Sequence, residues 1–206
     1  MCSLPCELVV ELQGTLLGAG EPARDPNAEW EMIMLGDGSW LNVSRGWMLG
    51  CDTLLEQLAA TVPWRQGRRR MYDRVLDDPR LSCWYPVGAP LPHPVLDRAR
   101  DDIASHYDLP LRSLALNYYR NGRDSVAFHR DRELRDTTDA IVAILTLGST
   151  RPFLLRPRGG GRSIDLRPAS GDLLVMGGRT QADWEHGVPK VTRSGPRISA
   201  SWRWCA

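Results

Sequence analysis

Three residues of this chain have the types and the spacing for chemistry on a metal ion. His129 and Asp131 stand two positions apart, and His186 follows 55 residues after Asp131. Two imidazoles and one carboxylate are the ligand set that holds Fe(II) on one face and leaves the opposite face open. If the three side chains converge, a co-substrate and O2 can bind to the same ion, as in a non-haem iron oxygenase. The alternative is an exposed turn in which Asp131 caps a helix.

The elements that must position these residues fall into two groups. Leucine and valine spacing predicts a helix over Asp52–Val62, capped by Asp52 or Thr53, and a second helix over Pro94–Tyr107. Strands are also expected at Glu7–Leu12 and Ser39–Val43. Short strand-like runs separated by glycine turns follow at 112–119, 125–129, 140–147, 151–156, 162–167, 172–176, 184–188 and 197–204. This order predicts an α+β protein with a double-stranded β-helix (jelly-roll) core and N-terminal helices packed outside it.

Length and composition describe an ordinary globular protein of 206 residues. We expect an N-terminal arm over residues 1–50 and one functional domain over residues 51–206. No apolar run reaches membrane-spanning length, and the N-terminus lacks the basic segment of a secretory signal. The five cysteines have no metal or disulfide spacing, so free thiols in a cytoplasmic protein are expected.

Charge is unevenly distributed along the chain. Residues 1–60 hold nine acidic and two basic residues, whereas the remainder holds 16 acidic and 24 basic residues. Arginines gather at Arg65–Arg74 and at Arg151–Arg167. These stretches fit contact with nucleic-acid phosphates, and they fit a solvated surface equally well.

The run 197–204 alternates between polar and apolar residues. Because successive side chains of a strand point to opposite faces, Arg197, Ser199, Ser201 and Arg203 share one face. The other face carries Ile198, Ala200, Trp202 and Trp204. The polar face can line the interior of a sandwich, where an arginine fork would bind a dicarboxylate. The alternative is that this face points to solvent from an edge strand.

A set of motifs, in this order, resembles one known family. The motifs are Asn117–Tyr119, His129–Asp131, Leu145–Gly148, Gly171–Met176, Gln181–His186 and Pro196–Arg203. Together they are similar to the AlkB family of Fe(II)/2-oxoglutarate dioxygenases, which remove alkyl groups from nucleic-acid bases. The resemblance covers roughly residues 79–204 and is strongest to the branch that contains the animal single-strand demethylases.

The resemblance implies roles for individual residues. The iron ligands would be His129, Asp131 and His186. The residues that bind 2-oxoglutarate would be Asn117, Tyr119, Arg197, Ser199 and Arg203. A nucleotide-recognition region over about residues 63–95 would contribute substrate contacts, and the expected substrate-binding residues are Arg80, Trp84, Tyr85 and Glu133. The cofactors implied are Fe(II), 2-oxoglutarate and O2.

Two departures from the family pattern concern the site. Ser199 stands where the family usually has asparagine, and Arg132 stands where close relatives carry an acid. The loop from Pro86 to Pro94 is short, so reduced recognition hairpins are expected. That favours a single-stranded substrate over an invaded duplex.

The resemblance therefore predicts an enzyme, a monomer, that oxidatively demethylates 1-methyladenine- and 3-methylcytosine-type bases in single-stranded DNA or RNA, with no membrane partner. One alternative is an Fe(II)/2-oxoglutarate hydroxylase of a protein or small molecule, which the acidic N-terminal arm and short loop would suit. Another is a catalytically silent binding module, against which the complete ligand set and both arginines argue.

Overall fold

The computed structural model describes residues 18–71, 73–111 and 113–206. The strand expected at Glu7–Leu12 lies outside these residues. Within the described ranges, no helix is both long and apolar enough to cross a membrane.

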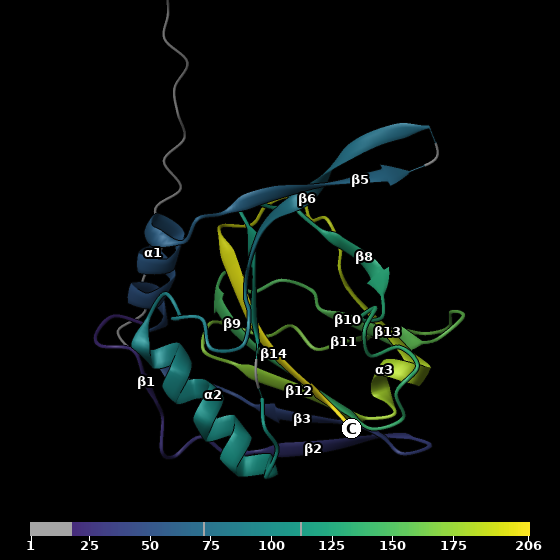
Figure 1. The fold of residues 1–206 in the computed structure, drawn as a ribbon, viewed down its shortest axis with the longest axis horizontal. Helices are drawn as coiled ribbons and strands as arrows, with labels where there is room; N and C mark the ends of the chain where they lie inside the picture. Colours follow the sequence, from purple (N-terminus) through teal and green to yellow (C-terminus); the bar gives the residue numbers. More distant parts are fainter. Residues whose placement is uncertain (1–17, 72, 112) are drawn as a thin grey trace, which may run out of the picture.

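Two sheets lie face to face and form the jelly-roll core that the sequence predicted (Figure 1). The major sheet has the order β2(Glu31–Gly36), β3(Ser39–Ser44), β12(Leu173–Gly178), β9(Ala140–Gly148), β14(Arg197–Cys205), β7(Leu114–Tyr119), β6(Arg74–Tyr85), β5(Arg65–Met71). The minor sheet has the order β11(Ile164–Asp165), β10(Leu154–Pro157), β13(Trp184–Val188), β8(Val126–His129). The short strands β1(Ala23–Arg24) and β4(Met48–Leu49) pair with each other, and a single turn of helix, α3(Thr180–Asp183), precedes β13.

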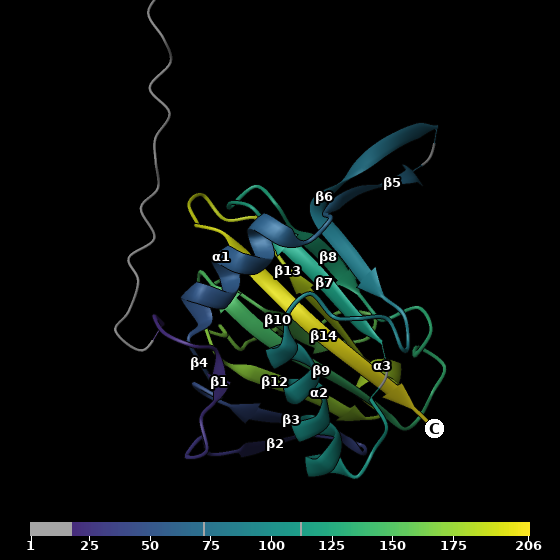
Figure 2. The same ribbon diagram turned by 60° about the vertical axis from the view of Figure 1, so that its left-hand side comes forward.

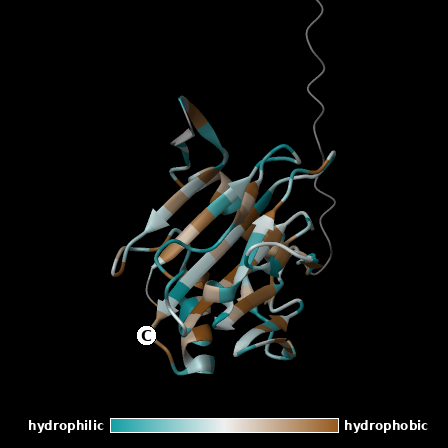
Figure 3. Cartoon of the chain, turned by 90° about the vertical axis from the view of Figure 1, so that its right-hand side faces the viewer, coloured by the Kyte–Doolittle hydropathy of each residue, from teal (hydrophilic) through white to brown (hydrophobic). Residues whose placement is uncertain are grey.

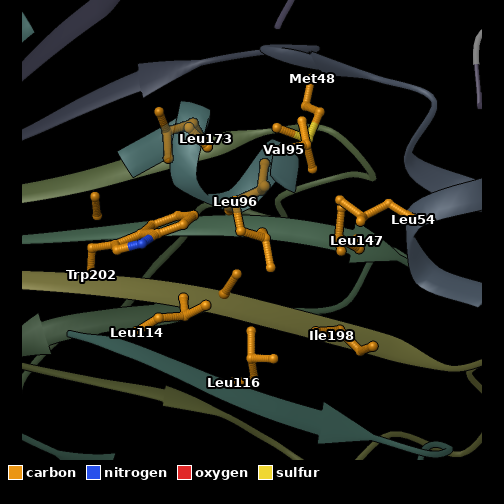
Figure 4. Close-up of a cluster of buried hydrophobic side chains, with 14 of the residues drawn as sticks. Met48, Leu54, Val95, Leu96, Leu114, Leu116, Leu147, Leu173, Ile198 and Trp202 are labelled. Carbon is orange, nitrogen blue, oxygen red and sulfur yellow. The ribbon is translucent and has the colours of Figure 1, made fainter. Parts of the chain in front are cut away.

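Helices α1(Cys51–Thr61) and α2(Pro94–Tyr107) cover the face of the major sheet that points away from the minor sheet (Figures 1 and 2). Both match the sequence prediction to within one residue. Leu54 of α1 and Leu96 of α2 pack against Leu116, Ile198 and Trp202 of the strands in one buried cluster (Figure 4). A second apolar cluster fills part of the space between the two sheets. Hydrophobic and hydrophilic residues alternate along the strands (Figure 3). One face of the major sheet therefore packs against the helices, and the other lines the space between the two sheets.

The start of α1 differs from the expectation. Neither Asp52 nor Thr53 caps the helix, because the helix begins at Cys51 and its N-cap is Gly50. Gly50 has a left-handed backbone (φ 66°), and a β-carbon there would come within 2.7 Å of the Glu21 backbone. Glycine therefore fits here for steric reasons, and the chain turns into the helix without a side-chain hydrogen bond.

A long hairpin of β5 and β6 projects from one end of the major sheet (Figures 1 and 2). This corrects the expectation of reduced recognition hairpins, and it also places Arg68 on a strand. Arg68 forms an exposed ion pair with Asp77 of β6, with 3.1 Å between Nε and Oδ1. The segment Arg65–Met71 lacks apolar alternation, which is why a strand was not expected there.

Part of the segment expected to be an arm extends the major sheet. Strand β3 pairs with β12 along six residues, and β2 pairs with β3 at the edge of the sheet. Residues 31–44 thus form two strands of the major sheet. A boundary at residue 50 stays a prediction, since residues 1–17 are outside the described ranges.

Candidate metal centre and co-substrate pocket

The jelly roll brings His129, Asp131 and His186 together between the two sheets. One ligand-type atom from each side chain lies within 4.8 Å of the others, a grouping that could hold a metal ion. His129 ends β8 and is the register partner of His186 in β13, so the two imidazoles project from neighbouring strands to the same side. Their ring centroids are 4.3 Å apart. Asp131 reaches the same point from the turn after β8.

The surroundings of each imidazole suit it for binding a metal ion. The Nδ1 atom of His129 lies 3.0 Å from the carbonyl oxygen of Ala127, a contact that leaves Nε2 free to accept a metal. His186 is buried and stacks on Phe153, with 5.7 Å between centroids. Burial first, then the nearby His129, lowers the pKa of His186 to about 3, so its ring is neutral at physiological pH. Neutral imidazole is the form that binds metals.

Asp131 is buried and held from two directions. Its Oδ2 accepts a 2.7 Å hydrogen bond from Nε of Arg203, and its backbone N–H donates to Oε1 of Gln181 at 3.1 Å. Burial alone would raise the pKa of Asp131, but Arg203, His186 and His129 outweigh it and lower the pKa below its usual value. The carboxylate is therefore charged and oriented before any ion arrives.

Arg197 carries the second unusual feature of this interior. Its side chain is completely buried, yet only Nη2 has a hydrogen bond, to Oγ1 of Thr146 at 3.1 Å. Nε and Nη1 have no partner among the described residues. Burial lowers the pKa of Arg197 to about 10, so the group stays charged at neutral pH. A buried cation with two unpaired donors is costly unless an anion joins it.

A second buried arginine lies close by, and both of its terminal nitrogens are paired, although its Nε has no partner among the described residues. Arg151 donates to the backbone carbonyls of four residues, and its guanidinium carbon lies 5.4 Å from the centroid of the Tyr119 ring. The guanidinium carbon of Arg197 lies 5.7 Å from the same ring. The guanidinium of Arg197 is therefore the positive charge in this interior that lacks compensation from the described residues, and a carboxylate would pair with it.

The residues expected to bind 2-oxoglutarate gather in this interior. A polar cavity beside the two imidazoles is lined by Asn117, Tyr119, Ser199 and Arg203. The structure decides between the two interpretations of β14, because Arg197 and Ser199 are buried and do not point to solvent. A donor set of two imidazoles and one carboxylate, together with the unpaired guanidinium donors of Arg197, fits an Fe(II) ion and a dicarboxylate co-substrate.

The expected substrate residues divide into those near the cavity and one that is remote. Arg80 lines the cavity, and its Nε donates to Oδ1 of Asn117 at 2.8 Å. Trp84 lies on the same face of β6 as Arg80, and its side chain is 63% exposed. Glu133 is exposed and lies 3.6 Å from Nε of Arg203. The departure Arg132, beside Glu133, is exposed as well.

Tyr85 is not brought to the site. It follows Trp84 on β6, so it points to the opposite face of the sheet and packs against the helix-side core. Alternation along the strand excludes both aromatic residues from facing the same ligand. The expectation that Tyr85 contacts a base is therefore wrong.

Sequence reasoning missed several residues that build the centre. Gln181 was part of a recognised motif, but its bond to the Asp131 backbone depends on how α3 packs. Arg151 and Phe153 were expected only as part of the strand-like run 151–156, but they lie in the loop between β9 and β10. Buried arginine is rare, yet nothing in the sequence distinguishes Arg151 from the exposed arginines around it.

Comparisons with known proteins agree with this geometry. The model of the 2OG-Fe(II) oxygenase superfamily matches residues 85–203. The chain is 36% identical over 173 residues to the human alpha-ketoglutarate-dependent dioxygenase alkB homolog 3, a match that covers 74% of this chain and 60% of that protein. It is 26% identical over 237 residues to the DNA oxidative demethylase ALKBH2 of Arabidopsis thaliana, covering 92% of this chain and 74% of that protein. The chain thus spans less than two thirds of the human relative's length.

Solved structures show the same fold at low sequence identity. The structure of OsALKBH1 superposes with a TM-score of 0.57 and 15% identity, over 84% of this chain and 100% of that one. An oxidoreductase of the 2OG-Fe(II) oxygenase family from Burkholderia pseudomallei gives a TM-score of 0.53 and 15% identity, over 74% of this chain and 78% of that one. By its motifs, its metal-ligand geometry and these matches, the chain belongs to the 2OG-Fe(II) oxygenase superfamily and, within it, to the AlkB family.

Proposed function

We propose that this chain is an Fe(II)/2-oxoglutarate-dependent dioxygenase that demethylates 1-methyladenine- and 3-methylcytosine-type bases in single-stranded DNA or RNA. The observation that carries the proposal is the convergence of His129, Asp131 and His186 on a cavity lined by Tyr119, whose ring lies 5.7 Å from the guanidinium of a buried arginine, Arg197, with two donors unpaired among the described residues. The names of the similar proteins, two of which are a dioxygenase and a DNA oxidative demethylase, support the reaction and the substrate class.

Bound Fe(II) and 2-oxoglutarate supply the activation of O2 that hydroxylates a C–H bond. One oxygen atom enters the N-methyl carbon of the substrate, and the other enters succinate as 2-oxoglutarate loses CO2. The hydroxymethyl group would then leave as formaldehyde: its hydroxyl proton is lost to water, the C–N bond breaks, and the base nitrogen keeps the electron pair, so that the cationic base becomes neutral. The protein's part is to hold the groups in position and to keep water out.

Each residue of the cavity has a role in that placement. His129, Asp131 and His186 would hold the ion. Arg197, helped by the Tyr119 hydroxyl, would bind the far carboxylate of 2-oxoglutarate through its two unpaired donors. The remaining co-substrate contacts would come from Asn117, Ser199 and Arg203. Ser199 offers one hydroxyl where the family usually has an amide, so this contact is altered and not lost.

The substrate side lies at the mouth of the cavity. A paired base cannot reach the ion, so the nucleotide must be flipped out or already unpaired. Trp84 offers an exposed ring for stacking, and Glu133 offers a negative charge to a cationic methylated base. Arg65 and Arg68 on the projecting hairpin could contact phosphates. The length of this hairpin removes one argument for a protein or small-molecule substrate, and it equally removes the short-loop argument against a duplex.

The proposal extends to the state of the protein. Cys51, Cys83 and Cys205 are free thiols, which suits a reducing compartment such as the cytoplasm. We propose that the enzyme acts as a monomer there, since each part of the site comes from one chain. Sedimentation analysis that gives a dimer at working concentration would contradict this part.

The test is release of formaldehyde and succinate from methylated oligonucleotides. Protein supplied with Fe(II), 2-oxoglutarate and O2 should release both from single strands that contain 1-methyladenine or 3-methylcytosine, and no formaldehyde from the unmethylated strands. His129→Ala serves as the inactive control. Absence of formaldehyde from every methylated DNA and RNA strand, with hydroxylation of a peptide under the same conditions, would favour the alternative hydroxylase.

A further inference from the structure

Three side chains on the outer face of the minor sheet lie directly behind the metal ligands. Phe128 precedes His129 in β8, and Glu185 precedes His186 in β13, so both point away from the cavity. Arg156 of β10 is the register partner of Glu185 and shares this outer face. We call Phe128, Arg156 and Glu185 the outer clamp.

The outer clamp joins three strands through one guanidinium. Nε and Nη2 of Arg156 donate to Oε2 of Glu185 at 3.1 and 2.9 Å. The guanidinium carbon also lies 3.8 Å from the centroid of the Phe128 ring. Strand β13 lies between β10 and β8 in the sheet, so Arg156 reaches across β13 to stack on a residue of β8 (Figure 1). The Arg156 side chain is 32% exposed and that of Glu185 23%, so water screens this pair only in part.

The ladder that joins the ligand strand β8 to β13 is short and irregular. Strand β8 is four residues long and ends the minor sheet, and its ladder with β13 has two register pairs with an irregularity between them. The contact of His129 Nδ1 is with Ala127 of the same strand, so it orients the ring without holding the strand. Gly187 of β13 lies close against the β8 backbone: a β-carbon at this position would come within 3.1 Å of the Phe128 backbone nitrogen. Contacts outside the ladder hold the residues on both sides of His129: Nη1 of Arg130 donates to the Ala182 carbonyl oxygen at 3.1 Å, and the outer clamp holds Phe128.

We propose that Arg156 is a positioning residue for the metal centre, which acts from the outer face by holding the His129 strand against the His186 strand. The inference rests on the proposed metal site. Asp131 already has Arg203 and Gln181 to hold it, whereas the outer clamp supplies the corresponding restraint for His129. A planar guanidinium is suited to this task because it stacks on an aromatic ring and forms an ion pair at the same time.

The experiment is a Co(II) titration of metal-free protein, followed by the visible absorption of bound Co(II). Arg156→Met and Phe128→Leu should each weaken Co(II) binding roughly 10-fold, the lower end of what loss of a supporting contact costs a metal site. The double variant should be little weaker than either single variant, because both remove one shared contact. Arg156→Lys keeps the charge but loses the planar stack, so its affinity should fall between those of the parent and Arg156→Met.

A control lies just after the edge strand β11 of the same sheet. Arg167 forms an exposed ion pair with Asp165 of β11, with 2.9 Å between Nε and Oδ2, and it contacts neither ligand strand. Arg167→Met should leave the Co(II) affinity unchanged. Thermal unfolding of each metal-free variant separates general stability from positioning.

The outcomes are distinguishable. Unchanged Co(II) affinity and spectrum in Arg156→Met, with a lower unfolding temperature, would show that the outer clamp only stabilises the sheet, and would overturn the inference. Equal weakening by Arg167→Met would overturn it as well. Failure of the parent protein to bind Co(II) would refute the metal site itself, and the positioning role with it.

Discussion

The two faces of the major sheet are built from the same strands but have different functions. On β14, Ile198, Ala200 and Trp202 face the helices and are buried among apolar side chains. Arg197 and Ser199 face the minor sheet and are equally buried, but Arg197 has two donors without a partner among the described residues. The helix face holds the fold together by packing, whereas the cavity face holds polar groups at a cost that a ligand removes.

This difference means that stability and binding respond to different substitutions. Changes on the helix face should lower the free energy of unfolding and leave ligand affinity alone. Changes on the cavity face should abolish or weaken binding, and some should stabilise the ligand-free protein.

The largest effect is expected at a metal ligand. His129→Ala leaves two ligands and should abolish Co(II) binding measured by titration of metal-free protein. His129 is partly exposed, so the fold should survive, as circular dichroism would show. His106 of α2 gives the control, because it stacks on Trp30 on the helix side of the major sheet. His106→Ala should bind Co(II) like the parent. Co(II) binding by His129→Ala with parental affinity would remove His129 from the ligand set.

The next effect concerns the helix face. Trp202→Ala should lower the free energy of unfolding by about 3–5 kcal/mol, because a fully buried ring is replaced by a cavity. Denaturant unfolding measures it. The Co(II) affinity of the folded variant should stay within error of the parent. Trp202→Phe should cost less than Trp202→Ala, since it leaves a smaller cavity and the indole N–H has no partner to lose among the described residues. A large loss of Co(II) affinity in the folded variant would mean that the two faces are not independent.

The third effect has the opposite sign. Arg197→Met replaces a buried cation that has two unpaired donors, so the ligand-free protein should gain roughly 1–3 kcal/mol of unfolding free energy. The same variant should lose the stabilisation that 2-oxoglutarate gives to the metal-loaded parent. Thermal unfolding with and without 2-oxoglutarate measures both. A destabilised variant that still responds to 2-oxoglutarate would contradict the role of Arg197.

The effect that is smallest at neutral pH is a pH dependence on the helix side. Burial raises the pKa of the Cys51 thiol from 9.0 to about 12. Between these values the unfolded chain ionises Cys51 and the folded protein does not, so stability falls as pH rises, by at most about 1.4 kcal/mol per pH unit. Cys51→Ala should be less stable at neutral pH but should show a weaker loss between pH 9 and 12. An identical slope in both proteins would mean that the thiol ionises in the folded state.

The sequence predicted the parts of the fold in which one side of an element is apolar. Leucine spacing placed α1 and α2, and alternation placed most strands of the jelly roll. The hairpin Arg65–Tyr85 was mostly missed, because a projecting hairpin meets solvent on both faces and needs no apolar pattern. Strand β2 was missed for a similar reason, since it is an edge strand with Met32 and Met34 exposed.

The site shows the same limit. Residue types and spacing suggested His129, Asp131 and His186 as a group, the family resemblance supported it, and the structure brings the three together. Trp84 and Tyr85 were both expected to contact substrate, but neighbours in a strand point to opposite faces, and Tyr85 packs against the helix-side core. The contact between Arg156 and Phe128 depends on the order of strands in the minor sheet, which no local pattern encodes.

One measurement tests the central claim most directly, namely that two imidazoles, one carboxylate and a buried arginine form a joint site for iron and a 2-keto acid. Fe(II) added without oxygen to the metal-free protein, followed by 2-oxoglutarate, should produce the visible charge-transfer band of a chelated keto acid. The band should be absent in His129→Ala and should require far more 2-oxoglutarate in Arg197→Met. A parent protein that gives no band at saturating Fe(II) and 2-oxoglutarate would contradict the account.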